Sequence, residues 1–180
     1  NELIKELHKQ RKTTFIVSNG LMPERLRKIE PPTQLYLSLD APNQTLFKKI
    51  DQPVIKDAWE KLNKSLDILK KLRAKTRTVL RITLIKNMNI IEPENYAKLI
   101  EKAKPLFVEI KAYMFVGFSR LRLSMENMPL HDEVKEFAER KWGTPQPIIV
   151  RNTGVGLGIA LLQGFGTYSF QISDAQQFVT

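Results

Sequence analysis

Four short segments of the chain combine apolar, β-branched and aromatic residues in the manner of β-strands. They are 13–20 (TTFIVSNG), 34–42 (QLYLSLDAP), 78–86 (TVLRITLIK) and 106–116 (LFVEIKAYMFV). The second and third alternate between apolar and polar positions, which indicates strands whose two faces differ. The pattern therefore predicts four strands.

A different period separates these strands, because apolar residues recur there at spacings of three and four. This period is clearest over 57–72, where tryptophan and leucines alternate with lysines. Further helices are predicted over 93–104, 131–142 and 1–9, and Pro105 ends the first of these three. Strands that alternate with helices favour a parallel sheet covered by helices, so we expect an α/β fold.

Polar residues stand where each predicted strand ends, which is where such folds bind their ligands. These ends are Ser18-Asn19-Gly20, Ser38-Leu39-Asp40, Lys86–Asn89 and Lys111–Arg122. The carboxylate of Asp40 can accept two hydrogen bonds from a ribose diol, but Asp-Ala-Pro-Asn is equally good turn and helix-entry chemistry.

Charged residues also interrupt the third and fourth strands. Arg81 lies on the face opposite Leu80 and Ile82. In an open antiparallel sheet that face meets water, whereas in a parallel barrel a covered arginine needs a carboxylate or a phosphate. Glu109 and Lys111 alternate in the same way, either as an internal ion pair or as part of a binding surface.

The charge of the chain favours a polyanionic partner. The net charge is +10, and all of the excess precedes Gly143, because the rest of the chain carries only Arg151 and Asp174 as charged residues, and their charges cancel. Nucleic acid is the first candidate for such a partner and an acidic membrane surface is the second. The alternative is a basic but otherwise ordinary surface.

The last 38 residues, 143–180, differ in character from residues 1–142, and hold six of the eight glycines. The run Gly154-Val155-Gly156-Leu157-Gly158 lacks the spacing of a dinucleotide fingerprint and the ending of a Walker loop. We therefore expect a strand pair with glycine-rich turns there, without chemistry, and divide the chain into residues 1–142 and the tail 143–180.

The composition excludes several kinds of site. The chain has no cysteine, so disulfides, thiolate zinc sites and cysteine-ligated iron–sulfur clusters cannot form within it. The two histidines, His8 and His131, are too isolated to suggest a metal site. No stretch is long and apolar enough for a membrane span, and we expect a soluble, cytoplasmic protein.

Several stretches, in this order and spacing, resemble one enzyme family. They are FIVSNGLMPERL, PPTQLYLSLDAPN, KKIDQPVIKDAWEKLNKSL, RTVLRITLIKNMN and FVEIKAYMFVGFSRLRLSMENMPLHDEV. Over about residues 1–141 the chain resembles the later part of the archaeal-type tRNA 4-demethylwyosine synthases, radical S-adenosylmethionine (SAM) lyases of wybutosine biosynthesis. The tail does not resemble them.

The resemblance implies the last four strands of a partial (β/α)6 radical SAM barrel, similar to a TIM barrel, with a glycine-rich tail. It implies the condensation of pyruvate with N1-methylguanosine at position 37 of phenylalanine tRNA, which uses S-adenosylmethionine and a [4Fe–4S] cluster. The cluster motif CxxxCxxC and the lysine proposed to bind pyruvate precede the matched part in this family. The resemblance therefore gives this chain no catalytic or metal-binding residue, and implies that the chain alone neither binds a cluster nor turns over.

The resemblance also assigns roles to positions of this sequence. It implies that S-adenosylmethionine meets Ser18, Asn19, Ser38, Asp40 and Arg81. It implies that the target base and the tRNA backbone meet Lys111, Tyr113, Ser119, Arg120 and Arg122. In this interpretation Asp40, Arg81 and Lys111 converge at one end of the sheet. The alternatives are a non-catalytic RNA-binding or scaffold module, and a chimeric or designed α/β protein.

Overall fold

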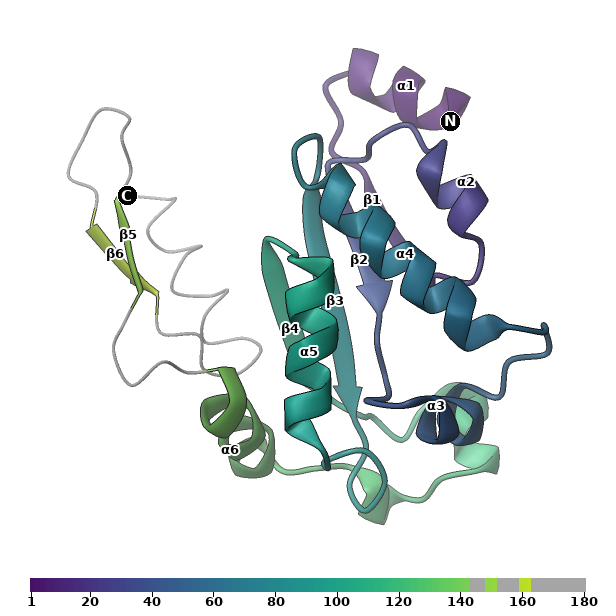
Figure 1. Cartoon of the computed structure of the whole chain (residues 1–180), viewed down its shortest axis with the longest axis vertical. Coiled ribbons are helices and arrows are strands. Elements are labelled where there is room, and N and C mark those ends of the chain that lie inside the picture. Colours follow the sequence, from purple (N-terminus) through teal and green to yellow (C-terminus); the bar gives the residue numbers. More distant parts are fainter. Residues whose placement is uncertain (143–147, 152–158, 163–180) are drawn as a thin grey trace.

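The computed structural model describes residues 1–142, 148–151 and 159–162, with side chains as far as Ala138. Four parallel strands form one sheet in the order β1-β2-β3-β4 (Figure 1). Their bounds are β1 Phe15–Ser18, β2 Gln34–Ser38, β3 Arg77–Leu84 and β4 Phe107–Ala112. The predicted parallel α/β arrangement is thus confirmed. Each strand overlaps its predicted segment, and β3 begins one residue before the predicted start.

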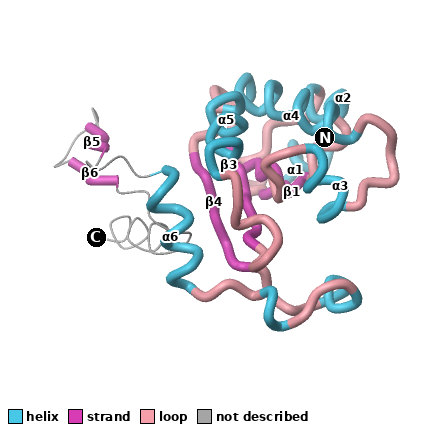
Figure 2. Tube along the Cα trace, turned by 60° about the horizontal axis from the view of Figure 1, so that its bottom comes forward, coloured by secondary structure: helices cyan, strands magenta, loops and turns pink. Residues whose placement is uncertain are grey.

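Helices connect the strands and cover one face of the sheet (Figures 1 and 2). Their bounds are α1 Glu2–Lys9, α2 Pro23–Arg27, α3 Gln44–Asp51, α4 Ala58–Leu72, α5 Pro93–Ala103 and α6 His131–Trp142. Two short 3-10 helices follow β4, η1 at Gly117–Leu121 and η2 at Met125–Asn127. Helices α2, α4 and α5 lie in front of the sheet in Figure 1, and α6 packs beside α5 and β4.

The hydrophobic core lies between the sheet and these helices. Leu35, Leu37 and Leu39 on the second strand segment are fully buried, as are Leu80 and Ile82 on β3. They alternate with polar residues because successive side chains of a strand point to opposite faces. The apolar stripe of α4 closes the core from outside, with its leucines buried against the strands.

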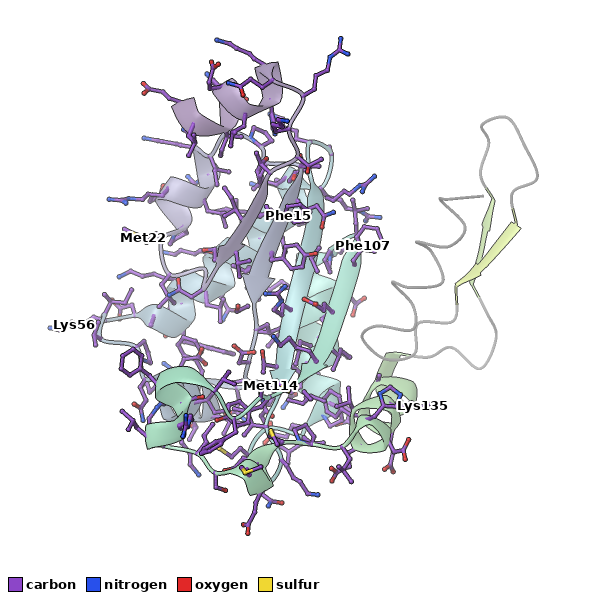
Figure 3. The ribbon with its side chains drawn as sticks, turned by 180° about the vertical axis from the view of Figure 1, so that it is seen from behind. Phe15, Met22, Lys56, Phe107, Met114 and Lys135 are labelled. Atoms are coloured by element: carbon purple, nitrogen blue, oxygen red, sulfur yellow. The ribbon has the colours of Figure 1, made fainter. Side chains whose placement is uncertain are left out.

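The opposite face of the sheet carries the polar alternation (Figure 3). Paired residues of a parallel sheet share a face, so Ser38, Arg81 and Glu109 form one row across it. Phe15 and Phe107 lie on this face at the two outer strands and are 59% and 40% exposed. In the part of the chain that the structure describes, no helix covers this face.

Two helices were not predicted from the sequence, α2 and α3. Helix α2 has only five residues, too few for a period of three and four to emerge. Helix α3 follows the turn after Asp40, and its first turn is capped by Asn43, whose side chain accepts a hydrogen bond from the Leu46 amide at 2.9 Å. The sequence Asp-Ala-Pro-Asn is therefore both strand end and helix entry.

The tail contributes two described strands, β5 Ile148–Arg151 and β6 Ile159–Leu162, which pair antiparallel. The predicted glycine-rich turns, including the run Gly154–Gly158, lie outside the described residues. Among the described helices, none has the length and apolar composition that crossing a membrane requires.

Candidate functional site

The predicted site residues meet where the strands end, on the polar face of the sheet. In the register, Ser38 pairs with Arg81 and Thr83 pairs with Lys111. Asp40 continues the row of Thr83, because its Oδ1 accepts a hydrogen bond from the Thr83 amide at 2.8 Å. Charged side chains from three strands therefore share one edge and one face, the arrangement predicted for Asp40, Arg81 and Lys111.

Two opposing influences act on the pKa of the Asp40 carboxyl group. Burial raises the pKa of Asp40, while its hydrogen bonds from Thr83 and the positive charges of Lys111 and Arg81 oppose the rise. A cationic or hydrogen-bond-donating ligand beside Asp40 would therefore stabilise its ionised form.

Arg81 already has the anionic partner that its position requires. Its Nε donates to Oε2 of Glu109 in an ion pair, and its guanidinium lies 4.6 Å from the centre of the Tyr36 ring. The ion pair of Glu109 is thus with Arg81, across neighbouring strands. A second anion meeting Arg81 would have to share it with Glu109.

Asn89 holds the edge together, and its role was not predicted. Its side chain is fully buried, and its Oδ1 accepts from the Ile85 amide at 2.6 Å. Its Nδ2 donates to the carbonyl oxygens of Asp40 at 2.9 Å and of Thr83 at 2.8 Å. One amide thus fixes the end of β3 against the segment after β2. The sequence indicates Lys86–Asn89 only as a polar strand end, because one partner of Asn89, Asp40, is distant in sequence.

A cavity of about 360 Å³ opens directly beyond this edge. It lies among the strand ends, α3 and the segment that follows β4. Its polar and charged lining includes Asp40, Lys49, Thr83, Tyr113, Ser119 and Arg122. The cavity therefore joins residues that the resemblance assigns separately to the cofactor and to the substrate, and adds Lys49 and Thr83 to them.

Hydrogen bonds fix the segment after β4 at the cavity wall. The Tyr113 hydroxyl donates to Ser119 Oγ at 2.9 Å, and Ser119 Oγ donates to the Val116 carbonyl at 2.6 Å. Arg122 donates to the Ile50 carbonyl at 3.1 Å. Because Tyr113 is only 6% exposed, its ring supports this wall, and it is not the open aromatic platform that a base could stack on.

A second carboxylate, Asp51, stands close to this cavity and was not predicted. Desolvation and the negative charge of Asp40 raise the pKa of Asp51 to about 7, against the opposing charge of Arg122. The negative charge of Asp40 disfavours ionisation of Asp51, so Asp51 keeps its proton to a higher pH than an isolated aspartate does. The sequence offered no sign of this pair, since α3 itself was not predicted.

Ser18 and Asn19 stand apart from the other predicted residues. Ser18 pairs with Leu37 and so belongs to the helix-covered face, where its Oγ accepts from the Gly20 amide at 3.1 Å. Asn19 follows it in an exposed turn and accepts from the Leu21 amide at 3.2 Å. The structure brings neither of them to the cavity beyond β2 and β3.

This chain has side chains that suit S-adenosylmethionine, but it lacks those that a cysteine-ligated metal cluster needs. The carboxylate of Asp40 can accept from a ribose or an amino group, and the nearby cations Arg81 and Lys111 suit a carboxylate. In contrast, the chain has no cysteine. Within the described residues, no three side chains of the ligating types His, Cys, Asp or Glu are grouped to hold a metal ion. The residues present do not fit a cysteine-ligated cluster.

Comparison with known proteins gives a consistent result. Residues 102–144 match the protein family described as Wyosine base formation. The S-adenosyl-L-methionine-dependent tRNA 4-demethylwyosine synthase of Pyrococcus abyssi is 50% identical over 142 residues, which cover 77% of this chain and 41% of that protein. The synthase of the same name from Saccharomyces cerevisiae is 41% identical over 142 residues, covering 77% of this chain and 18% of that protein.

Solved structures show the same likeness. The structure of TYW1 with a lysine-pyruvate adduct bound has a TM-score of 0.70 and 38% identity, and the match covers 84% of this chain and 47% of that one. The crystal structure of archaeal TYW1 has a TM-score of 0.61 and 38% identity, covering 77% and 42%. The chain thus spans about two fifths of the length of the Pyrococcus abyssi relative. Over its aligned residues the resemblance seen in the sequence is confirmed, because this part of the chain is similar in sequence and in fold to part of the tRNA 4-demethylwyosine synthases.

Proposed function

We propose that this chain supplies the later strands of a radical SAM barrel in a tRNA 4-demethylwyosine synthase. The reaction would condense pyruvate with N1-methylguanosine at position 37 of phenylalanine tRNA, as a carbon–carbon lyase of wybutosine biosynthesis in the cytoplasm. The observation that carries the proposal is that Asp40, Arg81 and Lys111 share one edge of the sheet, in a chain 50% identical to a synthase over 142 residues.

The exposed polar face supports the barrel. In a closed or partial barrel this face lines the interior, where charged residues serve the ligand. The row of Ser38, Arg81 and Glu109 and the partly exposed Phe15 and Phe107 suit an interior that other strands enclose. The four strands of this chain would then form one side of the reaction chamber.

Asp40 is proposed to hold the ribose or amino group of S-adenosylmethionine, and Ser38 and Arg81 its carboxylate. When bound, the cofactor supplies the radical chemistry that removes a hydrogen atom from the methyl group of the base. The residues of this chain bind and orient it. Thr83 and Asn89 fix the position of Asp40, while Glu109 keeps Arg81 directed across the polar face.

The tRNA is proposed to approach the carboxyl edge, where Arg120 and Arg122 would meet phosphates and Lys111 would face the base. Lys111 shares the row of Thr83, and Arg122 lines the same cavity as Asp40. Because these 180 residues contain no cysteine, the [4Fe–4S] cluster would have to be held by residues outside this sequence.

Equilibrium binding of S-adenosylmethionine and of phenylalanine tRNA to the full chain tests this proposal. Asp40→Ala should weaken cofactor binding by about 10-fold or more, because it removes an ionisable hydrogen-bond acceptor from a largely enclosed site. Asp67→Ala is the matched control, since Asp67 lies on the outer helix α4 in an exposed ion pair with Lys102.

Three outcomes are decisive. Cofactor binding that falls with Asp40→Ala and persists with Asp67→Ala supports the proposal. Salt-sensitive tRNA binding without any cofactor binding supports instead the RNA-binding module, which the lack of cysteine favours. An iron–sulfur spectrum with cofactor cleavage after anaerobic reconstitution of the chain alone would show that the cluster does not need outside residues.

A further inference from the structure

The segment 113–123, here called the β4 loop, exposes far more apolar surface than a solvated loop needs. Phe118 is 89% exposed and Leu121 is 82% exposed. Val116, which directly precedes η1, is 63% exposed. Exposed apolar side chains that gather in one place mark contact surfaces on soluble proteins. The role of this surface was not apparent from the sequence, where Tyr113 was the aromatic residue assigned to the base.

The β4 loop is held in one conformation. The Tyr113 amide donates to the Leu84 carbonyl at 2.8 Å, and Ser119 Oγ joins the Tyr113 hydroxyl to the Val116 carbonyl. Gly117 supplies the left-handed backbone at φ +60° that turns the chain before Phe118. The exposure of Phe118 is therefore a consequence of a fixed local structure.

A second hollow, of about 530 Å³, lies on this loop. Its lining is Phe115, Gly117, Phe118, Arg120 and Leu121. The guanidinium of Arg120 lies 5.2 Å from the centre of the Phe115 ring. The hollow thus offers aromatic surface for a flat ring, and a positive charge beside it.

This combination fits a nucleotide of unpaired RNA better than a protein surface. Bases that are out of the helix stack on aromatic side chains, and arginine contacts the adjacent phosphate. The loop sequence YMFVGFSRLRL contains two arginines and no acid, in a chain of net charge +10. Its charge is therefore complementary to a polyanion, which decides between a nucleic acid and an uncharged apolar partner.

We propose that Phe118 is the stacking platform for an unpaired RNA base, and that Arg120 binds a phosphate next to it. The inference rests on the proposed function, which makes tRNA the substrate, and it specifies the residue that holds the loop of that tRNA. Phe118 takes the place of the buried Tyr113 as the residue that contacts a base.

The test uses the full chain and a short RNA hairpin that carries 2-aminopurine in its loop, whose fluorescence falls when the base stacks. Phe118→Ala should weaken binding by roughly 5- to 100-fold and abolish the quenching, because base–aromatic stacking is lost. Phe118→Trp should retain both. Leu3→Ala is the control, because Leu3 is a 70% exposed apolar residue on α1, at the other end of the sheet (Figure 1).

The salt dependence of binding separates stacking from charge. Phe118→Ala should leave the slope of log affinity against log salt unchanged, whereas Arg120→Ala should reduce its magnitude by about 0.7, the value for one phosphate of a single strand. Arg73→Ala is the charge-matched control, because Arg73 is an exposed residue at the end of α4, away from the β4 loop. It should leave the slope unchanged.

The outcomes distinguish the two proposals. If the wild-type chain does not bind the hairpin, the proposed function and the inference both fail. If it binds and Phe118→Ala has the affinity and quenching of the wild type, the proposed function stands and the inference is wrong. If Phe118→Ala leaves RNA binding intact but changes the sedimentation of the chain, the β4 loop is a protein contact, and the inference is overturned.

Discussion

Asn89 shows how much of the candidate site depends on a single side chain. Its amide joins the carbonyl oxygens of Asp40 and Thr83 and the amide of Ile85, without exposure to water. These three bonds set the position of the Asp40 backbone relative to β3. The side chain is a positioning group for the site, since none of its polar atoms is left for a ligand.

We predict that Asn89→Ala lowers the free energy of unfolding by about 2–4 kcal/mol, because it leaves buried backbone groups without partners. Asn95→Ala, which removes an exposed hydrogen bond to Glu92, should change it by less than about 0.5 kcal/mol. Urea unfolding of the two variants measures both values. Equal midpoints for both variants would show that the bonds of Asn89 are not required.

Asp51 gives the site a pH dependence. Its pKa rises from 3.8 to about 7 in the folded chain, so the folded state binds more protons than the unfolded state between these values. The stability that this group contributes is therefore present in full below about pH 4, and is lost as the pH rises through about 7.

We predict that Asp51→Asn is about as stable as the wild type at pH 4 and more stable at pH 8. The gain should be about 1 kcal/mol or less, because water still reaches Asp51 and screens its charge. Thermal unfolding of both proteins at the two pH values measures the difference. A difference that does not change with pH would contradict the raised pKa.

At the scale of elements, alternation and helical period were sufficient to predict the strands and the long helices. The apolar positions of β3 and the leucines of α4 are buried in the structure, whereas Trp59 at the start of α4 is half-buried. Helices α2 and α3 could not be predicted in this way, because each is short and packs against α4. The face to which Ser18 points also depends on register, which the sequence alone did not supply.

Gly20 illustrates how closely the elements pack. It lies after β1 at φ +72°, and an added Cβ would lie 2.7 Å from Leu37 Cδ1 and 2.9 Å from Leu62 Cδ1. Ser65 of α4 also donates to its carbonyl oxygen at 2.6 Å. The turn after β1 therefore packs tightly between β2 and α4.

We predict that Gly20→Ala destabilises the chain by about 1–3 kcal/mol more than Gly117→Ala does. Both substitutions strain a left-handed backbone, by about 1–2 kcal/mol, but only the first also overpacks a core. Gly117 is the matched control, because no atom lies within 4 Å of an added Cβ there. Equal losses in urea unfolding would show that the core yields to the added methyl group.

At the scale of the whole molecule, the parallel sheet explains why residues distant in sequence meet. Its strand ends gather Asp40, Thr83 and Lys111 at one edge, while α3 and the β4 loop close the space beyond it. The sequence predicted this edge through the topology alone. It did not predict the cavity or the exposure of Phe118, because both depend on how a loop folds against a helix.

The most direct test of the central claim is a chimaeric enzyme. The 142 residues of the Pyrococcus abyssi synthase that align with this chain would be replaced by the aligned residues of this chain. Mass spectrometry of nucleosides from phenylalanine tRNA would then measure 4-demethylwyosine after reaction with pyruvate and S-adenosylmethionine. We predict that the chimaera forms this product, and that Asp40→Ala in the chimaera reduces its formation at least about 10-fold. A chimaera that folds and binds S-adenosylmethionine as its parent synthase does, but forms no product, would contradict the proposed function.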